Sequence, residues 1–203
     1  MEAWHKLPAG FSGCWYDLNY IGSNAGTIAP SLSTLIIWMV GPVGCAKFIA
    51  PIALFILGFG AWFFFKRLKL SPLAAILGAL TATLISRFFS DACWGTAPHQ
   101  MAFGMDFVAL ALIVSSSATT PWHIRWARLA LAGFAVGINV VEAADIGAIF
   151  SVFVAAFAVF QPFTEEGPAL AKLGRGLGRT AIIAIFAAFF AAQTIVSLVG
   201  TQV

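Results

Sequence analysis

The stretch AKFIAPIALFILGFGAWFFF, residues 46–65, contains one charged side chain, Lys47. About 20 mostly apolar residues are enough to cross a membrane as a helix, so this stretch predicts a transmembrane helix. The whole chain agrees, because 61% of its 203 residues are hydrophobic and only 9% are charged. A soluble domain has about 25% charged residues. The chain is therefore predicted to be an integral membrane protein in contact with membrane lipid, and its net charge of +3 does not indicate a nucleic-acid partner.

Further apolar runs extend outward from this stretch along the chain. They predict an all-α, polytopic membrane helix bundle of about six transmembrane helices, with the other five near residues 71–90, 100–118, 126–142, 145–163 and 179–199. The apolar piece at 31–40 is about half the required length. We expect it to form a short interfacial helix in an outer N-terminal segment, residues 1–45, which precedes a transmembrane bundle at 46–203.

The basic residues indicate the orientation of the bundle. Eight of the eleven Lys and Arg residues lie in alternate connections, after the first, third and fifth predicted spans. The positive-inside rule places such connections in the cytoplasm. Residues 1–45 and the C-terminus are then predicted to be extracytoplasmic, in a multi-pass protein of the cell inner membrane. The first 45 residues follow no earlier span, which predicts further helices of a longer chain.

Several polar residues are expected near the outer ends of the predicted spans. Each charge within a membrane costs at least about 2.5–3.5 kcal/mol and normally faces the bundle interior or a wet cavity. We therefore expect one shared cavity, open to the outer side, lined by polar groups from four helices: Arg87, Asp106, Asn139, Glu142 and Gln193.

Structural alternatives remain for these residues. Arg87 could form an ion pair with Asp91, four residues on, or with Asp106 on the next helix. Asp91 and Asp145 lie at span ends, where helix caps and solvated loop residues are common, and His99 could simply lie at the membrane interface. Asp106 falls about 12 Å inside its helix, which is too deep for a loop residue.

The outer N-terminal segment has a second group of polar residues, CWYDLNYIGSNAG at 14–26, in which aromatic residues flank Asp17. Such aromatics form interfacial belts, and they also hold sugars and polar headgroups beside carboxylates. The three cysteines, Cys14, Cys45 and Cys93, have no metal-site spacing. We expect the cysteines to be small apolar residues or, alternatively, two of them to form a disulfide. No metal ligands are predicted.

The stretches DLNYIG (17–22), GPVGCAKFIAPIALFILGFGAWFFFKRL (41–68) and FFSDACWG (88–95) resemble the YfhO-like bacterial membrane proteins of the GT-C glycosyltransferase type. The resemblance implies transfer of a sugar from a polyprenyl-phosphate donor on the extracytoplasmic face. It also implies that Asp17 is the general base on the acceptor hydroxyl, and that Asp91 supports the acceptor or a divalent cation. Lys47 and Arg87 are the basic residues available to hold the donor phosphate.

Three functions are thus open at the level of sequence. The first is this glycosyltransferase-like module, with His99, Asp106, Glu142 and Asp145 as further substrate-binding candidates. The second is a transporter in which Asp106 and Glu142 are decisive, because acids inside spans are typical of transporters. The third is a non-catalytic membrane subunit, in which the acids would point into protein contacts and line no open outer cavity.

Overall fold

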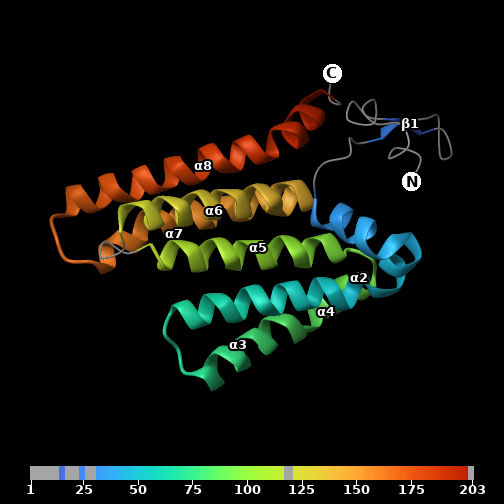
Figure 1. Ribbon diagram of the computed structural model, residues 1–203, viewed down its shortest axis with the longest axis horizontal. Helices are drawn as coiled ribbons and strands as arrows, with labels where there is room; N and C mark the ends of the chain where they lie inside the picture. The colour runs from blue at the N-terminus through green and yellow to red at the C-terminus, as the bar shows by residue number, and fades with distance from the viewer. Residues whose placement is uncertain (1–13, 17–22, 26–30, 117–120, 201–203) are drawn as a thin grey trace.

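The computed structural model describes residues 14–16, 23–25, 31–116 and 121–200, and from residue 31 onward the described chain is an all-α polytopic bundle, as predicted (Figure 1). Five of its helices are long and apolar enough to cross a membrane, or six if the bent pair α3 and α4 forms one span. The helices are α2 (Leu32–Arg67), α3 (Pro72–Leu84), α4 (Ser86–Cys93), α5 (Ala97–Val114), α6 (Trp122–Glu142), α7 (Ala144–Phe160) and α8 (Ala169–Gly200), with the 3-10 turn η2 at Gln161–Thr164.

Helix α2 is broken near its start. Gly41 has a φ of 73° and a ψ of 168°, which is not helical, and Pro42 follows it. A positive φ is readily adopted by glycine alone, and proline is favoured at the first position of a new helix. The short helix predicted at 31–40 is therefore a separate segment of α2, turned away from the long segment in Figure 1. Ser31 caps it by accepting a hydrogen bond from the backbone N–H of Thr34 at 3.0 Å.

The apolar run at 71–90 forms two helices instead of one straight span. Helices α3 and α4 are bent by 50° at Ile85. The hydroxyls of Thr81 and Thr83 donate to the carbonyls of Leu77 and Ala79, one turn back. Such side-chain bonds compete with the helical backbone and bend helices. Helix α4 therefore leaves the direction of α3 before reaching α5.

Small residues bring α2 and α5 into close contact. A Cβ atom on Gly60 would lie 2.4 Å from the carbonyl oxygen of Gly104. A side chain at position 60 would therefore keep the backbones of α2 and α5 further apart. One turn or two away, the fully buried Ala53 packs with Ala97 and Met101. Close backbone approach through small residues is the usual way that helices associate in membranes.

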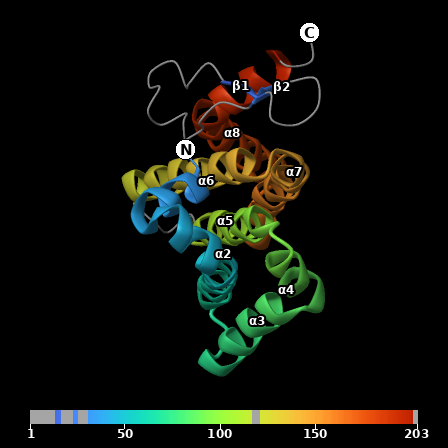
Figure 2. The same cartoon turned by 90° about the vertical axis from the view of Figure 1, so that its right-hand side faces the viewer.

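Helices α5, α6, α7 and α8 enclose a second, larger apolar core. We call it the apolar layer, and its buried members are Ala109, Ile113, Leu129, Ala132, Ala135, Val136, Val154, Ala158 and Ile183. Viewed along the bundle in Figure 2, α3 and α4 lie on the opposite side of α5 from α8. Large hydrophobic side chains such as Phe55, Val152 and Phe189 are exposed around the bundle, as expected of a surface that contacts lipid.

The two ends of the bundle differ in charge. At the basic end α2 finishes and α3, α6 and α8 begin, next to the connections that carry most of the Lys and Arg residues. At the acidic end α2, α5 and α7 begin and α6 finishes, on the right in Figure 1.

The N-terminal part adds an antiparallel ribbon that the sequence did not predict, with β1 (Cys14–Tyr16) paired to β2 (Ser23–Ala25).

Helix α8 begins at Ala169, ten residues before the predicted start of the last span at 179. This first part of α8 contains several glycines, which have a low helix propensity. Gly176 instead provides close packing, because a Cβ atom at this position would lie 2.6 Å from the carbonyl oxygen of Val159 on α7. Packing against α7 therefore outweighs the low helix propensity of the segment.

Candidate functional site

The predicted site residues gather at the acidic end, but they do not form one group. Asp17 lies outside the described residues. Asp106 is buried where α5 meets α6, and Glu142 is half-buried where α6 meets α2, whereas Arg87 and Asp91 lie together on α4. Lys47 and Asp145 are exposed on α2 and α7, and His99 is half-buried in the first turn of α5.

Asp106 pairs with an amide across the α5–α6 interface. The Nδ2 of Asn139 donates to Oδ1 of Asp106 at 2.5 Å, and the two side chains are 0% and 6% exposed respectively. Asp106 lies about 14 Å along α5 from Ala97, at 1.5 Å per residue. The remaining oxygens, Oδ2 of Asp106 and Oδ1 of Asn139, are both buried and have no hydrogen-bond partner among the described residues. The pair therefore keeps two unused acceptors inside the bundle, where a buried polar group without a partner is expensive.

Glu142 joins the end of α6 to the beginning of α2. Its carboxylate accepts hydrogen bonds from the Ser33 backbone N–H, at 3.2 and 3.3 Å, and from the Ser33 hydroxyl. Ser33 lies in the first turn of α2, where free N–H groups and the helix dipole favour an anion. The same hydroxyl lies 3.9 Å from the sulfur of Met101 on α5. Glu142 thus acts as a cap contributed by another helix, and it holds the short segment of α2 against the bundle.

Gln100 is a further polar residue at this end, and the sequence analysis missed it. It lies on α5, is 0% exposed, and finds no hydrogen-bond partner for its Nε2 or its Oε1 within the described part of the chain. The signal in the sequence was a single amide between His99 and Met101 at the start of an apolar helix. Because a buried amide normally has partners, Gln100 is a candidate for contact with a polar group absent from the structure.

Arg87 and Asp91 form a surface ion pair on α4. Nε of Arg87 donates to Oδ2 of Asp91 at 2.8 Å, and the side chains are 82% and 27% exposed. This is the i, i+4 pairing that the sequence allowed, and its contribution to stability is about 0–1 kcal/mol at an exposed position. The described residues engage neither the Nη atoms of Arg87 nor Oδ1 of Asp91. A fork of cationic donors and a carboxylate oxygen therefore remain available within one helical turn.

The hollow formed by described residues beside this end is apolar. It has a volume of about 440 Å³ and lies where the short segment of α2 meets α6 and α8, lined by Ser31, Leu32, Thr34, Leu35, Trp38, Ile138 and Phe190. Asp106 and Glu142 do not line it.

Within the part of the chain that the structure describes, no three His, Cys, Asp or Glu side chains lie close enough to hold a metal ion. Cys45 and Cys93 are free thiols.

A charged group that was not predicted from the sequence lies at the basic end. Glu165 forms ion pairs with Arg175 and Arg179, which are four residues apart on α8. Arg179 is 5% exposed although it carries a charge. The signal was present in EEGPALAKLGRGLGR, residues 165–179, where two arginines at helical spacing follow two glutamates.

No known protein family, curated protein or solved structure matches the chain.

Proposed function

We propose that this chain is the membrane module of a glycosyltransferase-like protein that acts at the acidic end of the bundle. In this proposal the acidic end faces the extracytoplasmic side of the inner membrane, and a polyprenyl-phosphate sugar is the donor. The family resemblance of the sequence suggests the reaction. Two features of the structure support it: the polar residues of α5 and α6 at the acidic end, and the Arg87–Asp91 pair.

The orientation follows from the division of basic residues. Lys66, Arg67, Lys69, Arg125, Arg128, Lys172, Arg175 and Arg179 all belong to the basic end. The positive-inside rule assigns this end to the cytoplasm. The acidic end then faces outward, which is the side where polyprenyl-linked sugars are used in the proposed reaction.

The apolar layer supports work at one membrane face over movement of a solute across the membrane. It lies between Asp106 and the basic end, and its members come from four helices. An ion or polar solute would have to cross this packed apolar region at a high desolvation cost. The polar groups between this layer and the acidic end can serve a substrate that approaches from the acidic face.

The Arg87–Asp91 pair is the single observation that carries the proposal. The 50° bend at Ile85 carries α4 away from the direction of α3, toward the start of α5 at the acidic end. The free Nη donors of Arg87 suit a phosphate oxygen, which accepts charge-assisted hydrogen bonds from such a fork. Oδ1 of Asp91 can accept from a sugar or acceptor hydroxyl. A donor phosphate and an acceptor hydroxyl would then bind side by side, and the resemblance assigns the base on that hydroxyl to Asp17.

The proposal is tested by sugar transfer from tritiated polyprenyl-phosphate hexose and pentose in proteoliposomes that contain the full chain. Loss of a general base or of a supporting carboxylate lowers such rates by about 100-fold or more. We expect this loss for Asp17→Asn and Asp91→Asn, and retained transfer for Glu166→Gln, which changes an exposed acid at the basic end. Absence of transfer by the wild-type chain, or unchanged transfer by both aspartate variants, would contradict the proposal.

A second candidate function is transport of an ion or solute, and the unpartnered oxygens of Asp106 and Asn139 favour it. A buried acid in a membrane helix is a common site of ion or proton binding. The apolar layer counts against it in the conformation described. In the same proteoliposomes, a flux driven by a pH gradient and abolished by Asp106→Asn would support transport over sugar transfer.

A further inference from the structure

A hollow of about 150 Å³ lies between α6 and α8 at the basic end. Its lining is Arg125, Trp126 and Leu129 from α6, and Arg175, Gly178, Arg179 and Ile182 from α8. Three arginines therefore contribute to the lining of one small space. A water molecule occupies about 30 Å³ of liquid, so the hollow has room for a few waters or for one phosphate group.

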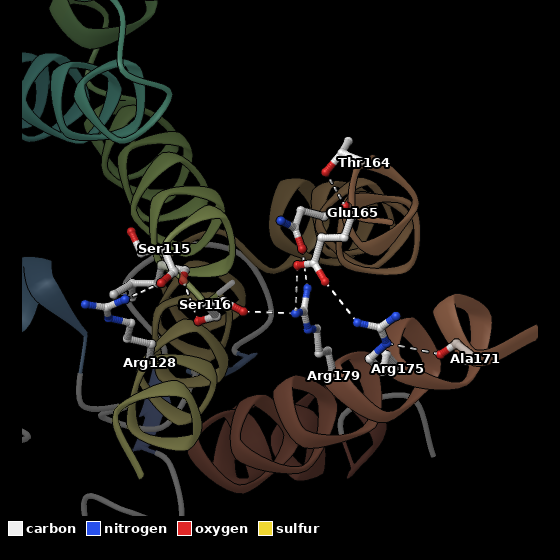
Figure 3. A network of polar contacts seen from close by, with 10 residues as sticks. Ser115, Ser116, Arg128, Thr164, Glu165, Ala171, Arg175 and Arg179 are labelled. Carbon is white, nitrogen blue, oxygen red and sulfur yellow. Dashed lines mark hydrogen bonds and ion pairs between the residues drawn. The ribbon is translucent and has the colours of Figure 1, made fainter. Parts of the chain in front are cut away.

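Arg179, one of the lining residues, is held by several polar partners (Figure 3). Its guanidinium donates to the carbonyl oxygen of Ser116 at 2.9 Å and to Oε1 of Gln161, and it lies 3.6 Å from Oε1 of Glu165. Figure 3 shows these contacts converging from the end of α5, from η2 and from the loop that precedes α8. A buried arginine fixed by three partners is a preorganised part of a binding site, because its side-chain entropy is already lost.

The positive charge around the hollow exceeds the negative charge. Among the described residues, Glu165 is the one carboxylate that contacts the group, and both Arg175 and Arg179 share it, at 3.0 and 3.6 Å. Arg125 is half-buried and has no ion-pair or hydrogen-bond partner among the described residues. Three positive charges against one negative charge leave a net charge of +2. Like charges gathered at a half-buried site repel each other, so an anion that bridges them would be stabilised.

The rest of the lining is apolar. Leu129 and Ile182 lie one turn further into the bundle than Arg125 and Arg179, and the exposed Trp126 lies beside them. Gly178 leaves the mouth open, since a Cβ atom there would meet nothing within 4 Å. Arginines at the helix ends above apolar residues match a phospholipid, which has a phosphate at headgroup level and a hydrocarbon chain below it. Tryptophan is also enriched at this level of a membrane.

We propose that this hollow binds the phosphate of an anionic phospholipid in the leaflet at the basic end of the bundle. Arg125 and Arg179 hold the phosphate oxygens from α6 and α8, and the acyl chain lies along Leu129 and Ile182. The bound lipid thereby links two helices that are not neighbours in sequence. A net charge of +2 favours a lipid with a net negative charge, such as phosphatidylglycerol, over zwitterionic phosphatidylcholine.

The proposal is tested by native mass spectrometry of the full chain in detergent, titrated separately with phosphatidylglycerol, phosphatidylcholine and inorganic phosphate. Arg125→Gln removes the guanidinium that has no protein partner, so the fold should be kept and unfolding temperatures should match. We expect binding of phosphatidylglycerol to weaken by about tenfold in this variant, the effect of losing one charge-assisted hydrogen bond. Lys69→Gln is the matched control, because it removes an exposed positive charge from the α2–α3 turn at the same end.

Each result decides for or against the lipid site. Tight binding of phosphatidylglycerol by the wild-type chain and by Lys69→Gln, with loss in Arg125→Gln, supports it. Equal binding of both lipids, or equal phosphatidylglycerol binding by Arg125→Gln and wild type, would overturn it. A third result would also overturn it: inorganic phosphate binds to the wild-type chain and not to Arg125→Gln, but it does not displace phosphatidylglycerol. The hollow would then be a site for free phosphate.

Discussion

At the scale of single residues, the Asp106–Asn139 pair has the least usual chemistry in the described part of the chain. One hydrogen bond of 2.5 Å joins the side chains, and it leaves one oxygen of each buried and unpaired. Two unpaired acceptors in a membrane-buried interface are unfavourable unless a proton, an ion or another donor is shared between them. Because Asp106 lies deep in α5, burying its polar side chain has a high desolvation cost in the folded bundle.

Two substitutions at Asp106 should have different effects on stability. In Asp106→Asn, an amide donor replaces Oδ2 and can bond to the unpaired oxygen of Asn139, so we expect the unfolding temperature to be unchanged or raised. In Asp106→Leu, the amide of Asn139 loses its acceptor, which should cost about 1–3 kcal/mol. Thermal unfolding of the purified chain in detergent measures both. An equal loss in the two variants would show that the carboxylate itself, and not hydrogen bonding, is what the fold requires.

Sequence reasoning at this scale found most of the residues, but not their partners. The Arg87–Asp91 pair could be foreseen, because both residues lie on one helix at i, i+4 spacing. The partner of Asp106 depends on how α5 and α6 rotate against each other, which the sequence does not specify, and it is Asn139 instead of Arg87. The use of Glu142 to cap α2 likewise depends on how the short segment before Gly41 folds back.

At the scale of elements, the closest packing is between α2 and α5, where Gly60 faces Gly104. Gly60→Ala would place a methyl group 2.4 Å from a backbone oxygen that cannot move without its helix. Forcing extra atoms into such a contact typically costs about 1–3 kcal/mol, so the unfolding temperature should fall.

Gly174→Ala on α8 is the matched control for this prediction. A Cβ atom at Gly174 would meet nothing within 4 Å, so the substitution should only reduce the flexibility of the helix, and it should stabilise the protein by about 0.5–1 kcal/mol. Thermal unfolding of both variants checks the pair. The packing account would be contradicted if Gly60→Ala were as stable as Gly174→Ala.

The sequence predicted the helices themselves well, and their ends and bends less well. The apolar runs were clear because a membrane span must be long and almost free of charge. The bend between α3 and α4 has no glycine or proline to announce it, and it is associated with threonine hydroxyls that bond to the preceding turn. The early start of α8 was missed because the tight contact of Gly176 with α7 exists only in the folded bundle.

At the scale of the whole molecule, the bundle separates two kinds of chemistry by one apolar layer. Acids, amides and the Arg87–Asp91 pair lie toward one end, whereas Glu165 and its arginines lie at the other. This separation underlies both proposals, since sugar transfer is assigned to the acidic end and lipid binding to the basic end. The sequence predicted the division of charge, but it did not predict the arginine hollow, whose lining comes from helices about 50 residues apart.

The proposed function places the acidic end on the extracytoplasmic side, and the accessibility of Cys93 to labelling shows which side of the membrane this end occupies. Cys93 is an exposed thiol at the end of α4, two residues after Asp91. In a chain with Cys14→Ser and Cys45→Ala, a membrane-impermeant maleimide should label it in intact spheroplasts. In a cysteine-free chain with Glu166→Cys, labelling should require disruption of the membrane. The opposite pattern, with Cys93 protected and position 166 labelled in intact spheroplasts, would contradict the account.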